Sequence, residues 1–141
     1  MFRERHKRGT FFTKSIEVKE SPVHGLGVFA IEDIPKNTCL EICPILKIDK
    51  ALMQQWWDIE GERHVLLEYI FKSRKDGKHA IVWGYGSIYN HSYENSNALF
   101  RWSTDHKNCD AIEFWSTREI KKGEEIFTKY CKDKEDEWLW F

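Results

Sequence analysis

The segment from residue 86 to residue 100, GSIYNHSYENSNALF, places an amide, an imidazole and a hydroxyl in a row between aromatic side chains. Asn90 and His91 both donate and accept hydrogen bonds, so the pair can hold a polar ligand against an aromatic wall. With Ser92, the same letters also fit a glycosylation sequon, a Ser-His nucleophile pair and a plain Asx turn. Adjacent residues rarely place a hydroxyl on the neighbouring imidazole, which disfavours the nucleophile pair. The turn and the ligand site both stay open from this segment alone.

A second candidate for chemistry is the glycine-rich stretch HGLGVFA, residues 24–30. It is similar to the G-x-G-x-x-G/A fingerprint of dinucleotide sites, which requires a long helix directly after the glycines. Pro35 follows too soon for such a helix, so dinucleotide binding is disfavoured. What remains is that Gly25 and Gly27 permit a close backbone approach or a positive φ.

Metal chemistry has little support in the sequence. The cysteines do not form paired C-x-x-C hooks, and none of the six His lies at zinc-finger spacing. We therefore expect no metal site and interpret the cysteines as free thiols of an intracellular chain. They are Cys39, Cys43, Cys109 and Cys131.

Composition indicates one globular domain. The chain has 141 residues, a formal net charge of -1, and 15% aromatic residues. The near-neutral balance argues against direct nucleic-acid binding, and no apolar run is long enough to span a membrane. The N-terminal MFRERHKRGT is charged and has no apolar stretch, so we expect no secretory signal and no glycosylation. An intracellular location follows from these expectations.

Alternation and turn signals predict a mostly-β domain that would position these residues. The strand expected over residues 39–48 is predicted to be interrupted at Pro44. Asp49 is predicted to cap a short helix over residues 50–58, and Asp76-Gly77 predicts a hairpin. The expected strands cover residues 11–20, 28–34, 39–48, 64–71, 97–102, 109–120 and 126–130.

Three motifs occur in a fixed order: SPVHGLGVFA, then YNHS, then GEEIFTKY. This set resembles the SET domain family of protein-lysine methyltransferases, from about Ser15 to the C-terminus. The chain is most similar to the short stand-alone SET proteins of bacteria and large viruses, a likeness that GYGSIYNHS and the terminal WLWF strengthen. The resemblance implies a SET-domain (β-clip) fold of several short sheets, few short helices and a knot-like C-terminal threading. One domain would span residues 1–141, with 1–14 an N-terminal extension and 131–141 a short post-SET tail.

The resemblance also implies a cofactor, S-adenosyl-L-methionine, which becomes S-adenosyl-L-homocysteine. Asn90 and His91 would hold its adenosine and amino-acid parts, and Trp140 would stack near the adenine. A terminal core anchor is the alternative role for Trp140. The methionine end would lie in a backbone cradle made by His24, Gly25, Leu26 and Gly27.

Methyl transfer to lysine is an in-line displacement that requires the neutral amine. An apolar, aromatic channel and a nearby sulfonium both lower the pKa of the amine, so no metal is needed. By resemblance, Tyr130 would lie beside the transferred methyl, and we assign it to orientation rather than to base catalysis. Tyr69 is the candidate for a second channel tyrosine, with core packing as its alternative.

The sequence departs from the family pattern in three places. The NHSYENSNA stretch lacks the usual proline and has one extra residue before Asn97. Tyr93 stands where members with a zinc-binding post-SET module have cysteine, which argues against structural zinc. Leu26 stands where some viral members have tyrosine, so the number of methyl groups added is not predicted.

The leading functional hypothesis is an enzyme that methylates an exposed lysine of a histone or another basic protein. The alternative is a non-catalytic module on the SET fold that binds a lysine peptide or the cofactor. A third is a structural protein that forms a homodimer through its aromatic C-terminus. The sequence does not decide the substrate.

Overall fold

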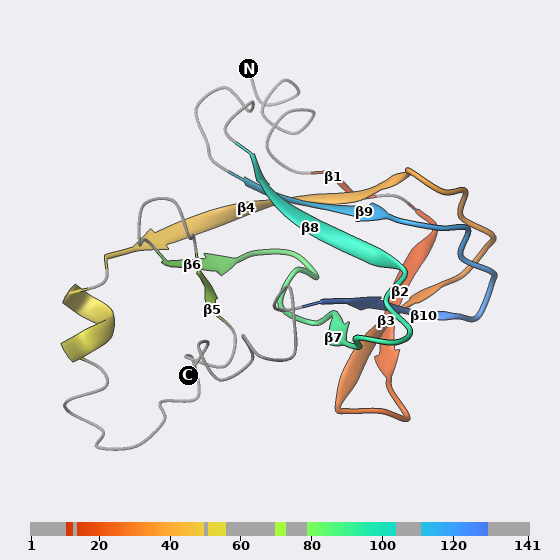
Figure 1. Cartoon of the computed structure of the whole chain (residues 1–141), viewed down its shortest axis with the longest axis horizontal. Helices are drawn as coiled ribbons and strands as arrows, with labels where there is room; N and C mark the ends of the chain where they lie inside the picture. The colour runs from red at the N-terminus through yellow and green to blue at the C-terminus, as the bar shows by residue number, and fades with distance from the viewer. Residues whose placement is uncertain are drawn as a thin grey trace.

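The protein is described here by a computed structural model, which covers residues 11–12, 14–49, 51–55, 70–72, 79–103 and 111–129. This part of the chain is built from short strands and one short helix over residues 51–55, so the mostly-β prediction is confirmed (Figure 1). The strands are β1 (Phe11–Phe12), β2 (Ile16–Glu20), β3 (Leu26–Ala30), β4 (Cys39–Ile48), β5 (Ile70–Lys72), β6 (His79–Val82), β7 (Asn90–His91), β8 (Ala98–Ser103), β9 (Ala111–Ser116) and β10 (Glu125–Thr128).

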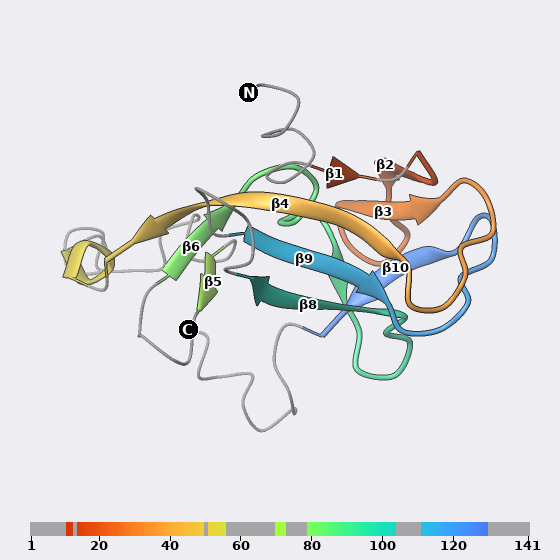
Figure 2. The same cartoon turned by 90° about the horizontal axis from the view of Figure 1, so that it is seen from above.

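The strands form two sheets. The six-stranded sheet has the order β5-β6-β4-β9-β8, with β1 added against β4, and the four-stranded sheet has the order β2-β3-β10-β7. Figure 2 shows β4, β9 and β8 side by side, with β2, β3 and β10 of the smaller sheet near one end of them. All pairs are antiparallel except β10 with β7, which run parallel. This parallel pair brings the Asn-His segment beside the last described strand.

Strand β4 runs through Pro44, so the expected interruption is wrong. Pro44 pairs with Ala111 on β9, and its carbonyl accepts a hydrogen bond from the N–H of Trp83 at 3.0 Å. In an antiparallel sheet, the backbone N–H and C=O of one residue point toward the same neighbouring strand, which for Pro44 is β6. The missing N–H of Pro44 therefore removes only the last bond of the β4–β6 ladder, since β6 ends at Val82.

The stretch expected as one strand over residues 11–20 is two strands in different sheets. Phe11 pairs with Ile42 on β4, whereas Ile16 pairs with Ala30 on β3. A turn at residues 14–15 separates them. Alternation alone did not reveal this change of partner, because both halves carry apolar residues at strand spacing.

Other expected elements are found with shifted ends. The strand predicted over residues 28–34 is β3, which starts earlier at Leu26 and ends at Ala30. Asp49 begins the short helix, because its carbonyl accepts the N–H groups of Leu52 and Met53. The rest of the helix predicted over residues 50–58, after position 55, lies outside the described part.

The predicted hairpin at Asp76-Gly77 joins β5 and β6, which are antiparallel with Lys72 opposite His79. The turn itself lies outside the described residues, and so does most of the strand expected over residues 64–71. Among the described residues, no helix is long and apolar enough to cross a membrane.

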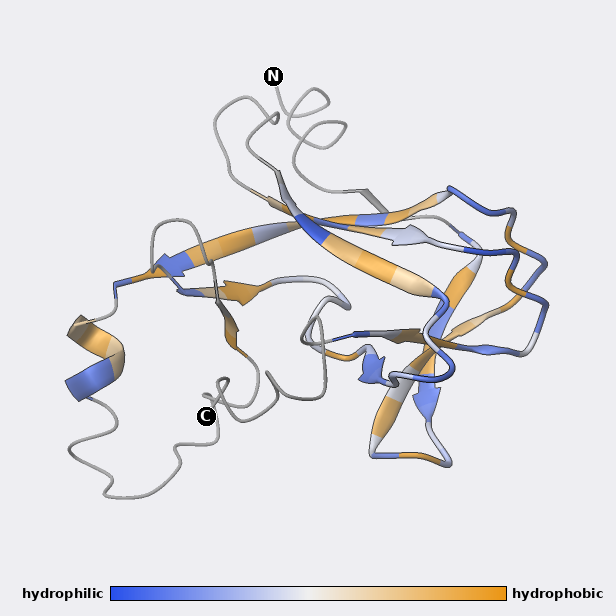
Figure 3. Cartoon of the chain, viewed as in Figure 1, coloured by the Kyte–Doolittle hydropathy of each residue, from blue (hydrophilic) through white to orange (hydrophobic). Residues whose placement is uncertain are grey.

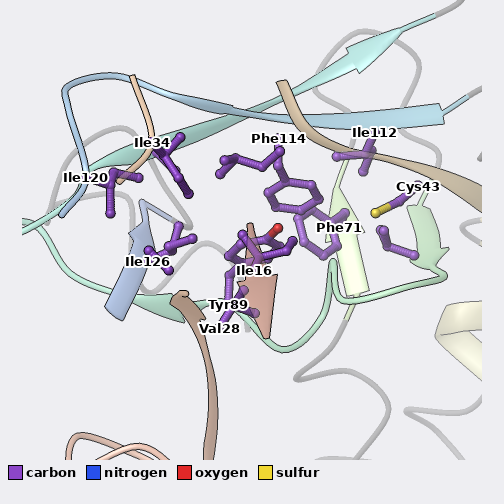
Figure 4. Close-up of a cluster of buried hydrophobic side chains, with 14 residues drawn as sticks. Ile16, Val28, Ile34, Cys43, Phe71, Tyr89, Ile112, Phe114, Ile120 and Ile126 are labelled. Atoms are coloured by element: carbon purple, nitrogen blue, oxygen red, sulfur yellow. The ribbon is translucent and has the colours of Figure 1, made fainter. Parts of the chain in front are cut away.

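The hydrophobic core lies between the two sheets (Figure 4). The ring of Tyr89 stacks on Phe114 of β9 with a centroid distance of 4.4 Å, and Phe71 meets Phe100 edge-on at 4.9 Å. Figure 3 shows apolar residues along much of β4 and β8 and hydrophilic ones at the connecting turns. Because Tyr89 is fully buried and directly precedes Asn90, core packing fixes where β7 begins.

Candidate functional site

The side chain of Asn90 connects the first two sequence motifs. Its Nδ2 donates to the carbonyl of His24 at 2.9 Å and to that of Leu26 at 3.1 Å. The same nitrogen donates to Glu125 Oε1 at 2.8 Å, and Asn90 is almost fully buried. The amide is therefore a structural joint between the glycine-rich turn, β7 and β10.

The glycine-rich turn closes the β2–β3 hairpin, and each glycine has its own reason. Gly25 has φ of 49°, a left-handed conformation that side chains disfavour, and its carbonyl accepts the N–H of Ser21 at 2.8 Å. Gly27 is buried, and a Cβ there would lie 2.2 Å from Glu125 Oε1. The sequence left two options open for these glycines, and the structure uses both.

The third motif contributes β10, the strand between β3 and β7. Phe127 is the register partner of Asn90, and Thr128 is that of His91. On the other side, Glu125 is the register partner of Phe29 in β3. The order of the three motifs along the sequence thus becomes a side-by-side arrangement of the segments that carry them.

The loop after His91 holds β10 through Asn97 despite its unusual sequence. Asn97 Nδ2 donates to the carbonyl of Glu125, and Asn97 Oδ1 accepts the N–H of Phe127, both at 2.9 Å. The N–H of Ser92 donates to the carbonyl of Thr128, and its hydroxyl oxygen accepts the N–H of Asn95. The local side-chain turn in this loop is thus made by Ser92, whereas the amide of Asn90 binds distant segments rather than forming an Asx turn.

The described residues of the proposed cradle differ in exposure. His24 and Gly25 are exposed at the hairpin tip, and Leu26 is 52% exposed. The ring of His91 is half-buried and meets Tyr93 edge-on at 4.2 Å. An exposed leucine beside a buried amide leaves an apolar surface next to polar groups, as a ligand with both characters requires.

Glu41 is a buried carboxyl near the turn that leads to Asn90. It is 2% exposed, and its Oε2 accepts the N–H of Tyr85 at 3.3 Å. Among described residues, no donor meets Oε1 with hydrogen-bond geometry, although the Tyr89 hydroxyl and the Cys43 thiol lie close enough to lower its pKa. Burial is the larger effect and raises the pKa of Glu41, so the fold favours its neutral form.

Sequence reasoning missed Glu41, Glu125 and Ser21. Glu41 stands inside the apolar stretch CLEICPILKI, and an acidic residue in such a strand was the available signal. Glu125 lies in the GEE motif, which was noted without a role for the second Glu. Ser21 gave no signal.

Three predicted site residues lie outside the described part: Tyr69, Tyr130 and Trp140. The passage of the chain after residue 129, where the knot-like threading is expected, lies outside it too. Cys39 and Cys43 are free thiols, and the described residues contain no group of three or more His, Cys, Asp or Glu suited to a metal ion.

The motif geometry agrees with a comparison against protein families, in which residues 25–131 match the SET domain. The chain belongs to the SET domain family. A relative in Schizosaccharomyces pombe, named histone-lysine N-methyltransferase, H3 lysine-37 specific, is 35% identical over 126 residues, which cover 89% of this chain and 76% of the relative. Another in Mycosarcoma maydis, named H3 lysine-36 specific, is 28% identical over 84% of this chain and 12% of its own length.

Solved structures give the same SET fold. A candidate histone methyltransferase of Plasmodium falciparum has a TM-score of 0.66 and 28% identity, covering 87% of this chain and 98% of that one. The ctPRC2 complex bound to S-adenosylmethionine has a TM-score of 0.68 over 84% of this chain and 15% of that one; at 21% identity it shows the fold alone. The predicted family, SET fold and protein-lysine methyltransferase class are confirmed.

Proposed function

We propose that the chain binds S-adenosyl-L-methionine at the hairpin 24–27 and at Asn90 and His91, and transfers its methyl group to a lysine of a protein. The observation that supports this site is the convergence at one buried amide, where Asn90 contacts the glycine-rich turn and Glu125 of the third motif. Membership in the SET family supports the cofactor and the reaction class.

The chemistry of the site fits the charged end of this cofactor. S-adenosyl-L-methionine carries an ammonium and a sulfonium, and cations are held by oxygen acceptors. The carbonyls of His24 and Leu26 each have a second lone pair, and Glu125 accepts from the same amide nitrogen as these carbonyls. The exposed side chain of Leu26 would cover apolar parts of the ligand.

When bound, the cofactor supplies an electrophilic methyl group on its sulfonium. The protein binds and orients the reactants and excludes water, which lowers the pKa of the substrate amine. Tyr130 is our candidate for orienting the methyl group, Tyr69 for the lysine channel and Trp140 for the adenine. All three assignments are predictions by family resemblance.

The proposed substrate is an exposed lysine in a histone, a histone-like protein or another basic protein. The S. pombe relative is named for a lysine of histone H3, which supports a protein substrate of this kind. Such a substrate places the enzyme inside the cell, and in the nucleus if it acts in a eukaryote or a host cell. Direct nucleic-acid contact and a membrane partner are not expected, and a homodimer is a further proposal.

Two finer proposals concern the chain itself. A single SET domain over residues 1–141 would comprise an extension at 1–14 and a tail at 131–141. The second proposal is that the chain is most similar to the short stand-alone bacterial and viral members, which lack flanking zinc modules.

The cofactor proposal is tested by titration calorimetry with S-adenosyl-L-homocysteine. We expect one-to-one binding that weakens by roughly tenfold or more in Asn90→Ala, since hydrogen bonds of the cradle are removed. Asn95→Ala, an exposed change in the same loop, is the matched control and should bind normally. Well-folded wild-type protein that does not bind would contradict the proposal.

Turnover is tested with radiolabelled cofactor and histones or other basic proteins. Label on lysine that disappears in Tyr130→Phe supports the enzyme. Cofactor binding without transfer to any lysine would instead favour the non-catalytic binding module.

A further inference from the structure

The carboxyl group of Glu125 joins the segments that build the proposed cofactor site. Its Oε1 accepts from Asn90 Nδ2 at 2.8 Å, and its Oε2 accepts from the hydroxyl of Ser21 at 2.9 Å. Oε1 also occupies the space that a Cβ on Gly27 would need. The side chain is buried, at 9% exposure. A single carboxyl thus fixes the hairpin turn, β3 and β7 relative to β10.

An asparagine amide has a donor nitrogen and an acceptor oxygen, and its hydrogen-bond partners in the protein decide which of the two faces a ligand. Nδ2 of Asn90 has two hydrogens, and the acceptors around it are the carbonyls of His24 and Leu26 and the carboxyl of Glu125. In the part of the chain that the structure describes, no group donates to Asn90 Oδ1. The donor end is therefore used by the protein, and the acceptor end is left for a ligand.

We infer that Glu125 is a positioning residue of this site, which holds the Asn90 amide in one orientation and ties the 21–25 turn to β7. The inference rests on the proposed function, because it assigns Glu125 to the cofactor cradle through Asn90. A flipped amide would set Oδ1 against two carbonyls and a carboxyl oxygen. Repulsion among these acceptors disfavours the flip, and the carboxyl is the strongest of them.

Glutamine cannot reproduce these contacts, although it has the same shape. It keeps one acceptor oxygen, which would serve Asn90, and its amide nitrogen would then face Ser21. The hydroxyl oxygen of Ser21 already accepts the N–H groups of Val23 at 3.0 Å and His24 at 3.4 Å. A third donor there would leave the Ser21 hydroxyl hydrogen without its acceptor. Glu125→Gln therefore disturbs the joint without changing its volume.

The first measurement uses protein without cofactor. Selective ¹⁵N labelling of asparagine, with assignment by Asn90→Ala, reports the side-chain amide protons of Asn90. In Glu125→Gln we expect these protons to shift and to exchange with solvent roughly tenfold faster or more, because an amide oxygen replaces the carboxyl oxygen that accepts from Asn90 and the side chain loses its contact with Ser21. Glu124→Gln is the matched control: its side chain pairs with Arg118 at 3.3 Å, and the variant should leave the Asn90 signals unchanged.

The second measurement reports on ligand binding. For Glu125→Gln we expect the dissociation constant of S-adenosyl-L-homocysteine and the KM for the methyl donor to rise roughly tenfold. We expect kcat to stay within about twofold, because weaker cofactor binding that affects the ground and transition states equally changes KM alone. A role limited to overall stability would lower the melting temperature without this split.

The outcomes separate the inference from the proposed function. Wild-type amide signals and wild-type affinity in Glu125→Gln would overturn the inference while leaving the cofactor site intact. If wild-type protein binds no cofactor, the proposed function fails, and the amide signals still decide whether Glu125 orients Asn90. If Glu125→Gln does not fold, Gly27→Ala replaces it, because the new Cβ displaces the carboxyl. Unchanged Asn90 signals in that variant would overturn the inference.

Discussion

Asn97 binds Phe127 through both its backbone and its side chain. The backbone N–H of Asn97 donates to the carbonyl of Phe127 at 3.1 Å, and its Oδ1 accepts the N–H of Phe127 at 2.9 Å. Phe127 is also the register partner of Asn90 at the start of β7. The buried side chain of Asn97 therefore adds to the contacts that hold β10 beside β7.

Replacing Asn97 should therefore cost stability. Asn97→Ala leaves the Glu125 carbonyl and the Phe127 N–H without their partner, and we expect a loss of about 2–4 kcal/mol in the free energy of unfolding. Urea denaturation measures this loss. Asn95→Ala, which is exposed in the same loop, should change stability by less than about 0.5 kcal/mol. Equal effects from the two variants would contradict the assigned role of Asn97.

Gly84 and Gly123 offer a matched pair for separating backbone strain from steric contact. Both have positive φ, at 75° and 88°, but a Cβ on Gly84 would lie 2.9 Å from Glu41 Oε2, whereas one on Gly123 meets nothing within 4 Å. We expect Gly123→Ala to cost about 1–2 kcal/mol from strain alone. Gly84→Ala should cost about 1 kcal/mol more, because the Glu41 carboxyl must move. Denaturation curves that rank the two the other way would argue against this contact.

The raised pKa of Glu41 should make the stability of the fold depend on pH. Its pKa is raised in the fold above its ordinary value of 4.5, so the folded state holds this proton more tightly than the unfolded chain does. The contribution to stability is complete below pH 4.5 and is lost as pH rises through the raised folded value. The melting temperature of Glu41→Gln minus that of wild type should therefore increase as pH rises. Glu17→Gln, which removes an exposed carboxyl, corrects for the change in net charge, and a difference independent of pH would refute the prediction.

The thiol of Cys39 should react slowly in the native protein. Burial raises its pKa from 9.0 to about 11, and the negative charge of Glu113 adds to the effect. Because only the thiolate reacts, alkylation near pH 8 should run about a hundredfold slower than in the unfolded chain. Peptide mapping after timed iodoacetamide treatment measures this rate for Cys39 alone. Equal rates in the native and urea-unfolded protein would be incompatible with the half-buried setting of this thiol.

The sequence predicted which segments form strands better than it predicted how those strands pair. Alternation found most strands of the described part, and the order of three motifs led to the correct family. Pro44 was misjudged because its cost depends on where the neighbouring strand ends, which no local pattern contains. The strand expected over residues 11–20 changes sheets for the same reason: the partner of Phe11 lies on β4 and that of Ile16 on β3.

The candidate site shows the same limit at the level of single residues. The family resemblance singled out Asn90 and the glycine-rich turn as parts of one site, and in the structure the Asn90 amide contacts that turn. It did not reveal that Gly27 must lack a side chain because Glu125 fills that space. Nor did it reveal Ser21, whose hydroxyl donates to Glu125 on a strand far away in the sequence. Long-range complementarity of this kind is a property of the folded chain and leaves no periodic signal.

The placement of β10 between β3 and β7 has a consequence for synthesis on the ribosome. The hairpin that ends at Ala30 and the strand that begins at Asn90 are made early, but the strand that joins them includes Glu125. Until that strand emerges, a nascent chain has neither the Glu125 acceptor for Asn90 nor the backbone partner for Asn97. Binding competence would therefore arise in one late step, and such long-range closure is intrinsically slow.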